Sequence, residues 1–279
     1  MTIRIVTDST CDLPADTIAR YGIQVVPLYI NVGRRGYLDG IDITRQEFYQ
    51  NLPGFPEHPT TAVPSPQKFH AIYDALAEEG ASGILSIHIS TALSAVADVA
   101  QVAAQETTST PVLVFDARQL SLGTGFQVEM AAKMAAEGCS IEEIITTLQE
   151  QTKRTHVFAA LDTLEFLKRS GRMNKYLAGF ATLLQIKPIL TMYDGKPGTE
   201  RVRTRDRAMK RLIEMLEAIG PMERIAIVHT HARERVTELR SRAEHLLPQG
   251  DILTADITPV IGAHIGPGAV GFAVVGASA

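Results

Sequence analysis

The sequence predicts an α/β fold with two α/β domains, the first of which contains a doubly wound parallel sheet. Short apolar runs alternate with helical patterns in residues 3–153, and three of these runs end in loops that contain Asp, Ser or Thr. Strands that alternate with helices are typical of a doubly wound parallel sheet. A second series of strands and helices begins near His156. Because 279 residues are enough for two ordinary domains, we expect one at residues 1–155 and one at residues 156–279.

The elements of the first domain are predicted from hydrophobic periodicity and from helix start and stop signals. We expect strands at 3–6, 23–32, 83–89 and 111–115, helices at 14–21, 67–79, 95–106, 121–136 and 140–153, and another helix beginning near residue 43. Two capping boxes, Thr44 with Glu47 and Ser140 with Glu143, support two of the helix starts. Residues 33–42 are turn-like, and five prolines in residues 51–66 predict an extended loop.

The second domain is expected to continue this alternation. We expect strands at 157–161, 188–193, 201–205, 224–228, 251–258 and 272–276, and helices at 174–185 and 233–247. A further helix is capped by Asp162 and carries Lys168 and Arg169 in its last turn. Another is marked by a stripe of Met209, Leu212, Ile213 and Leu216. The strand at 201–205 carries alternating arginines, which form either a partner-binding stripe or, more commonly, an exposed edge that is protected by charge.

Composition excludes several classes of function. The formal net charge of −4 and the absence of Trp disfavour a nucleic-acid partner or an anionic membrane surface. No signal peptide or apolar run long enough to span a membrane is visible, so we expect a cytoplasmic protein without stable membrane insertion. Two cysteines, Cys11 and Cys139, do not form a disulfide framework. Cys11 follows a strand at the edge of the expected site, which leaves a reactive thiol as one interpretation.

Polar residues follow the predicted parallel strands of the first domain. Asp8, Ser9, Ser90, Ser94 and Asp116 all lie just after a strand or in the loop that follows it. Ligands of doubly wound sheets bind at the carboxyl ends of the strands. We therefore expect these side chains along one edge of the first sheet.

The segment 260–271 places His264 among Gly, Ala and Pro residues. Small residues allow a backbone to approach a ligand closely, and a buried imidazole needs a polar partner. Two interpretations stay open: His264 contacts a ligand, or it bonds a nearby carbonyl in a glycine turn that leads into the last strand. Gly266, Gly268 and Gly271 match G-x-G-x-x-G, but a strand follows them where a nucleotide-binding helix would be required.

Signatures of difficult chemistry are missing from the sequence. It contains no G-x-S-x-G elbow, phosphate-binding loop, C-x-x-C pair or H-E-x-x-H helix. His229 and His231 suggest a metal pair, but no matching third ligand is visible. The basic run at Lys168, Arg169 and Arg172 either serves a partner or complements a helix dipole. The remaining hydroxyls, histidine and strand ends suit the binding of an anion, with no metal and no cofactor.

Several motifs, in this order along the whole chain, resemble those of the DegV family of bacterial fatty-acid-binding proteins. They are Thr7-Asp8-Ser9-Thr10-Cys11-Asp12-Leu13-Pro14, Asp39-Gly40-Ile41-Asp42-Ile43-Thr44, Thr61 with Pro64-Ser65-Pro66 and Phe69, Ile89-Ser90 with Leu93-Ser94, Leu161 through Arg169-Ser170-Gly171-Arg172, and Gly262-Ala263-His264-Ile265-Gly266-Pro267-Gly268-Ala269. Two places depart from the family pattern. Thr-Ser-Gln-Pro is here Thr61-Ala62-Val63-Pro64, and Leu-Ser-Gly-Thr is here Leu93-Ser94-Ala95-Val96.

The resemblance implies two α/β domains with a long-chain fatty acid in a tunnel between them. It implies head-group contacts by Thr61, Ser94 and His264, with Ser90 and Arg169 as further candidates. It also implies a non-catalytic protein that presents the fatty acid to a separate fatty acid kinase for acyl-phosphate formation in phospholipid synthesis. In that case, Arg169 and Arg172 alternatively serve the kinase or the transferred phosphate.

Two other classes of function remain open at the level of sequence. One is a stand-alone hydrolase or kinase that uses Asp8, Asp116 or His264 as a base. The other is a regulatory or structural protein whose bound lipid serves only its stability. Chain length of the lipid and oligomeric state do not follow from the sequence.

Overall fold

The computed structural model describes residues 2–172 and 186–278, whose strands form three sheets. A parallel four-stranded sheet has the order β2-β1-β6-β7, and a mixed six-stranded sheet has the order β10-β9-β8-β13-β11-β12. A small antiparallel sheet has the order β4-β3-β5. The strands are β1 (Ile3–Asp8), β2 (Gln24–Val26), β3 (Tyr29–Val32), β4 (Arg35–Leu38), β5 (Thr60–Ala62), β6 (Gly83–His88), β7 (Val112–Asp116), β8 (Thr155–Ala160), β9 (Lys187–Tyr193), β10 (Lys196–Val202), β11 (Met222–His229), β12 (Leu253–Asp256) and β13 (Val270–Gly276).

Helices separate and cover the sheets. They are η1 (Ser9–Cys11), α1 (Ala15–Tyr21), α2 (Arg45–Asn51), η2 (Leu52–Gly54), α3 (Pro66–Glu78), α4 (Val96–Glu106), α5 (Leu122–Ala136), α6 (Ile141–Thr152), α7 (Glu165–Arg169), α9 (Arg205–Ile219), α10 (Arg233–Ala243), η3 (Glu244–Leu246) and α11 (Pro259–Ile265). Both predicted capping boxes are present, at the starts of α2 and α6. Among the described residues, no helix is long and apolar enough to cross a membrane.

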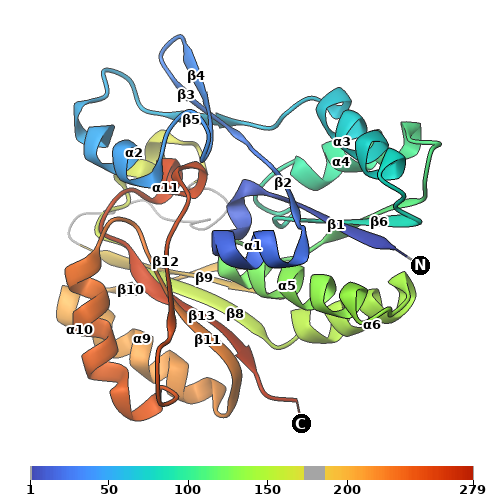
Figure 1. The fold of residues 1–279 in the computed structure, drawn as a ribbon. Helices are drawn as coiled ribbons and strands as arrows, with labels where there is room; N and C mark the ends of the chain where they lie inside the picture. The colour runs from blue at the N-terminus through green and yellow to red at the C-terminus, as the bar shows by residue number, and fades with distance from the viewer. Residues whose placement is uncertain (1, 173–185, 279) are drawn as a thin grey trace.

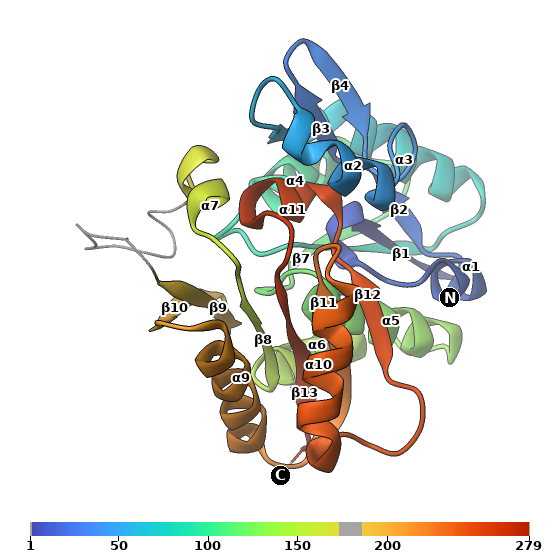
Figure 2. The same cartoon turned by 90° about the vertical axis from the view of Figure 1, so that its left-hand side faces the viewer.

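The elements stack in layers (Figures 1 and 2). Helices α3 and α4 pack on one face of the parallel sheet, while α5 fills the space between that sheet and the six-stranded sheet. Helices α9 and α10 cover the other face of the six-stranded sheet. This arrangement confirms the predicted α/β class with a parallel first sheet. The predicted domain boundary at residue 155 stays a prediction.

One long prediction, the strand at 23–32, is wrong because the chain changes sheets at Pro27. Residues before Pro27 form β2 of the parallel sheet, and residues after Leu28 form β3 of the small sheet. Proline cannot donate a ladder hydrogen bond, so it is disfavoured in the middle of a strand. The amide of Leu28 instead donates to Ser9 Oγ at 3.2 Å. The supposed turn at 33–42 contains β4, and the proline-rich loop contains β5, because both pair with β3.

Three predictions for the second half also need correction. Asp162 does not cap α7, because its carboxylate pairs with Lys187 at 3.0 Å and the amide of Glu165 bonds Thr163. The arginine-bearing strand is an edge, as predicted, but β10 runs from Lys196 to Val202 and Thr204 caps the next helix. The helix expected at 233–247 ends at Ala243. The helix expected at 174–185 lies outside the described residues.

The centre of the six-stranded sheet depends on one glycine in β13. Val270, Phe272 and Val274 pack toward α9 and α10, whereas Ala269, Ala273 and Val275 belong to the core shared with α5. Gly271 faces β8 so closely that an added Cβ would overlap the carbonyl oxygen of Phe158. The strands can therefore pair here only if this position has no side chain.

We predict that Gly271→Ala lowers the free energy of unfolding by about 2–3 kcal/mol or more, since overpacking against backbone forces strands apart. Chemical denaturation measures the change. Gly276→Ala is the matched control in the same strand, because its added Cβ would meet Ile219 at an ordinary 3.5 Å. Equal effects of the two substitutions would contradict the close approach at Gly271.

Candidate ligand-binding site

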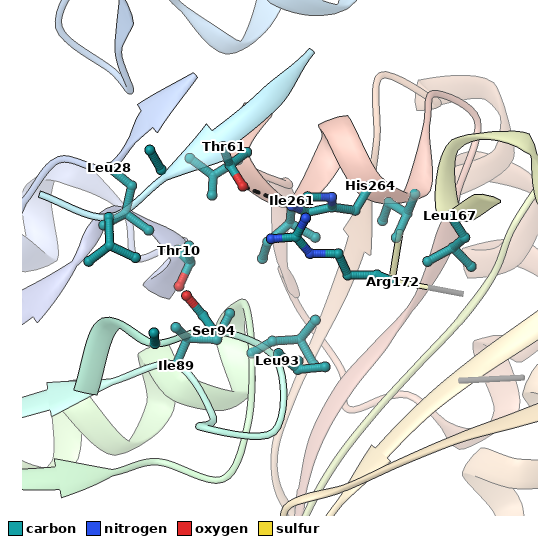
Figure 3. Close-up of a pocket in the computed structure, with 16 residues that line it drawn as sticks. Thr10, Leu28, Thr61, Ile89, Leu93, Ser94, Leu167, Arg172, Ile261 and His264 are labelled. Atoms are coloured by element: carbon teal, nitrogen blue, oxygen red, sulfur yellow. Dashed lines mark hydrogen bonds between the residues drawn. The ribbon is translucent and has the colours of Figure 1, made fainter. Parts of the chain in front are cut away.

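A cavity of about 260 Å³ lies where the carboxyl ends of β1 and β6 meet the small sheet and α11. Its volume is close to the lower end of the roughly 300–1,000 Å³ usual for small-molecule sites. Most of its wall is aliphatic: Leu28, Ala62, Val63, Ile89, Leu93, Ala95, Leu120, Leu167, Val260, Ile261 and Ile265. Its polar side chains are those of Thr10, Thr61, Ser94, Arg172 and His264 (Figure 3). This composition suits an apolar ligand with one polar end.

His264 reaches the cavity from the last turn of α11, where the sequence predicted a glycine loop. Thr258 caps this helix, with Pro259 at its first position, and Gly266 ends it with φ of +74°. Proline at the start and glycine after the end are typical helix signals. The glycines do permit close approach, but to protein side chains: an added Cβ would overlap Tyr49 at Gly262 and Phe166 at Gly266.

Thr61 faces His264 from the opposite side of the cavity. It lies in β5, where it pairs with Ile30 of β3. Its Oγ1 is 3.0 Å from Nε2 of His264, a hydrogen bond whose donor depends on the imidazole tautomer. Figure 3 shows this pair across the upper part of the cavity. The partner of Nε2 is therefore a hydroxyl and not a carbonyl. This contact does not support the interpretation in which His264 bonds a nearby carbonyl.

Ser94 and Thr10 add two hydroxyls that point toward each other (Figure 3). Ser94 precedes α4, and Thr10 lies in η1 directly after β1. The hydroxyl of Thr10 donates to Asp8 Oδ1 at 2.5 Å. Sequence analysis missed Thr10 as a lining residue, although its position just after a strand end was the same signal that singled out Asp8 and Ser9.

Asp8 itself lies behind the cavity in a fully buried network. Besides Thr10, it accepts from the amide of Ile89 at 3.2 Å and pairs with His88 Nδ1 at 2.9 Å. Burial alone would raise the pKa of Asp8, but the hydrogen bond and charge of His88, together with the bonds from Thr10, hold it below its ordinary value. Asp8 is therefore an ionised acceptor that fixes η1.

The buried network continues through His88 to a serine. Nε2 of His88 lies 2.7 Å from Ser86 Oγ, which also accepts from Tyr73. Asp8, His88 and Ser86 thus follow the order of a catalytic triad, but all three are 0% exposed. A nucleophile must reach its substrate, so the burial of these three side chains disfavours the hypothesis of a hydrolase based on Asp8. Their hydrogen bonds instead stabilise the carboxyl ends of β1 and β6.

Comparison with known proteins shows the family of the chain. A model of the DegV family matches residues 2–277. A DegV domain-containing protein of Streptomyces coelicolor is 36% identical over 277 residues, which cover 98% of each chain. The chain belongs to the DegV family.

Two solved DegV structures are similar along the whole chain. A DegV family protein from Thermus thermophilus, described for its fatty acid binding, is 36% identical with a TM-score of 0.90 over 99% of this chain and 100% of that one. DegV from Bacillus subtilis, described as a fatty acid binding protein, is 29% identical with a TM-score of 0.90 over 99% and 100%. These comparisons confirm the family and the fold class predicted from the motifs.

The two departures from the DegV pattern fall at the cavity. Ala62, Val63 and Ala95 all line it. Val96 is fully buried at the start of α4. In this DegV protein three of the exchanged positions therefore extend the aliphatic wall, and among the described residues the polar side chains of the cavity are the five named above.

Not every predicted site residue of this DegV protein reaches the cavity. Thr61, Ser94 and His264 line it, but Ser90 is buried behind it and supports the loop by accepting from the amide of Ala92 at 3.3 Å. Arg169 is exposed and pairs with Glu165 at 2.5 Å. Arg172 lines the cavity instead, and its Nη1 also donates to the carbonyl of Ser170 at 2.9 Å.

The other predicted edge residues serve the loops. Asp116 accepts from the hydroxyl of Thr91 at 2.6 Å. Ser9 bonds the amide of Leu28. Cys11 is buried, and burial raises the pKa of its thiol to about 12, which disfavours the interpretation as a reactive thiol.

The two imidazoles that suggested a metal pair lie in different surroundings. His229 ends β11 and is buried, whereas His231 lies in the following turn and is exposed. Within residues 2–172 and 186–278, no group of three or more potential ligands is placed to hold a metal ion.

We predict that Asp8→Ala lowers the free energy of unfolding by about 3–5 kcal/mol, because it leaves the buried His88 and two backbone amides without their acceptor. Thermal and chemical denaturation measure the loss. The control is Asp116→Ala, at the carboxyl end of β7 in the same parallel sheet. Because its hydrogen bonds are solvent-exposed, we expect a cost of about 1 kcal/mol or less. A loss for Asp8→Ala as small as that of the control would contradict the structural role.

Proposed function

We propose that this protein binds one long-chain fatty acid in the cavity, with the carboxylate at Thr61, Ser94 and His264. The observation that carries the proposal is that hydroxyls and an imidazole face an otherwise mostly aliphatic cavity, with Thr61 Oγ1 lying 3.0 Å from His264 Nε2. Fatty acid binding by similar DegV structures supports it. A ligand with a single polar end and a long apolar chain matches this distribution.

The magnitudes suggest how the two ends of the ligand divide the work. A tail of about fourteen methylenes, at about 0.8 kcal/mol for each buried CH₂, offers on the order of 11 kcal/mol before the costs of association. Each hydrogen bond to the carboxylate adds about 1.5–3 kcal/mol. The tail therefore supplies most of the affinity, while Thr61, Ser94 and His264 decide which end of the molecule enters where.

We further propose that the bound fatty acid is presented to a separate fatty acid kinase, and that the protein is the non-catalytic subunit. Arg172 lines the cavity, and Lys168 and Arg169 are exposed one turn earlier on α7. Exposed cations beside a head group suit either a kinase surface or the phosphate being transferred. The rival hypothesis, an enzyme that uses Asp8 with His264, is disfavoured because Asp8 is buried and bonded to His88.

The first test is the ligand itself. We predict that the protein purified without added lipid carries a fatty acid in about a one-to-one ratio. Native mass spectrometry compares the mass before and after denaturing extraction, and the extract is analysed for fatty acids. A native mass equal to the mass of the bare chain after gentle purification would count against the proposal.

A second test addresses the head-group contacts. His264→Ala should weaken binding of a fatty acid by about 1.5–3 kcal/mol, the value of a hydrogen bond to a charged group, and leave the methyl ester nearly unaffected. Paired titrations of acid and ester on both proteins measure this, with thermal melts beside them. Equal losses for both ligands, together with a lower melting temperature, would make His264 a scaffold residue.

Neighbouring threonines of β5 provide a matched control. Thr61 lines the cavity, whereas Thr60 is exposed and does not line it. Thr61→Val should reduce acid binding as His264→Ala does, while Thr60→Val should leave both titrations unchanged.

A further inference from the structure

The segment 256–258, directly before α11, is held by side chains from the first part of the chain. Arg45 Nη1 donates to the carbonyl of Asp256, and the hydroxyl of Tyr49 donates to the carbonyl of Ile257 at 2.9 Å. The hydroxyl of Thr258 donates to Asp39. The two residues joined by each of these three hydrogen bonds are 208 to 219 positions apart in the sequence. We call Arg45, Tyr49 and Asp39, which together hold these three successive residues, the clamp.

Asp12, which directly follows η1, reinforces the same clamp. Its Oδ1 accepts from the amide of Thr258 at 2.9 Å and pairs with Arg45 Nη2 at 3.1 Å. Burial raises the pKa of Asp12 to about 6, even though Arg45 and the bonds from Ser121 and Thr258 favour its ionised form. At neutral pH Arg45 thus serves two partners, the Asp12 carboxylate and the carbonyl of Asp256.

The clamp and the head-group site share one short helix. Thr258 is the N-cap of α11, and His264 lies in its last turn. Asp39 directly follows β4, and Thr61 lies in β5 of the same small sheet. This sheet and α2 therefore contact α11 at both ends, consistent with their position above it in Figures 1 and 2. A helix of seven residues is not stable alone, so tertiary contacts must set its position.

We propose that Arg45, Asp39 and Tyr49 are positioning residues of the head-group site, which seat residues 256–258 so that α11 holds His264 against Thr61. None of the three is among the residues that line the described part of the cavity. They act on the ligand through α11. The proposal rests on the proposed function for its ligand readout, but its effect on His264 itself does not require a ligand.

The test compares two arginines with the same kind of contacts. Arg45 bonds the carboxylate of Asp12 and a carbonyl, and Arg154 bonds the carboxylate of Glu223 and the carbonyl of Gly276. Their side chains are 35% and 25% exposed. Arg154 lies at the far end of β13, away from α11. Arg154→Gln is therefore the matched control for Arg45→Gln.

Palmitate and its methyl ester are titrated against wild type and both variants at pH 8, where Asp12 is ionised. Arg45→Gln should lower the preference for acid over ester by about threefold to tenfold, a smaller loss than in His264→Ala, because the hydrogen bond to the carboxylate is misplaced and not removed. Arg154→Gln should leave the preference unchanged, whether or not it lowers the stability of the fold. An unchanged preference in Arg45→Gln, with wild type binding the acid normally, would overturn the positioning role while leaving the proposed function intact.

A second readout needs no ligand. The ring ¹⁵N resonances of His264, assigned by their loss in His264→Ala, should shift in Arg45→Gln and stay in place in Arg154→Gln. Unchanged resonances in Arg45→Gln would overturn the proposal. If wild type binds no fatty acid, the proposed function fails, and this readout still decides the role of the clamp.

If Arg45→Gln does not fold, Tyr49→Phe replaces it, because it removes only the hydroxyl that bonds Ile257. Its control is Tyr193→Phe, which removes a hydroxyl bonded to the carbonyl of Lys153 at 3.0 Å. A shift of the His264 resonances in Tyr49→Phe alone supports the clamp, and equal behaviour of the two variants contradicts it.

Discussion

The contact between Thr61 and His264 is the constraint on which the site depends, because its partners are 203 residues apart and 3.0 Å from each other. Thr61 is placed by the pairing of β5 with β3, and His264 by a short capped helix. Glycines at 262 and 266 let that helix pack against Tyr49 and Phe166. The two halves of the cavity wall thus come together only when the long-range contacts of α11 are made.

The buried hydrogen bonds of Asp8 decide which hydroxyls of the cavity can donate to a ligand. Asp8 is ionised and accepts a hydrogen bond from the Thr10 hydroxyl, so Thr10 offers only lone pairs to the cavity. Ser94 and Thr61 carry hydroxyl protons that are not bound to a buried carboxylate. A ligand carboxylate needs donors, so it is better placed at Thr61, Ser94 and His264 than at Thr10. Arg172 adds positive charge to the same cavity.

Local signals allowed much of the fold to be predicted, and long-range contacts explain the rest. The capping boxes at Thr44 and Ser140 depend on residues three apart, so sequence alone revealed them. The apolar run at 23–32 hid a change of sheet at Pro27, which only the pairing partners of each half reveal. Ser94 and His264 were singled out from the residues themselves, Thr61 was found through the family motifs, and whether the three hold the carboxylate stays a prediction. The partners of Asp8 and Arg45 depend on how distant segments meet, and no spacing in the sequence reports that.

The most direct test of the account is a crystal structure of the protein with a fatty acid that carries bromine on its terminal carbon. Anomalous scattering locates the bromine without reference to the shape of the ligand density. We expect the carboxylate within hydrogen-bonding distance of Thr61, Ser94 and His264, and the bromine against the aliphatic wall away from them. Bromine beside His264, or a ligand bound outside this cavity, would contradict the account.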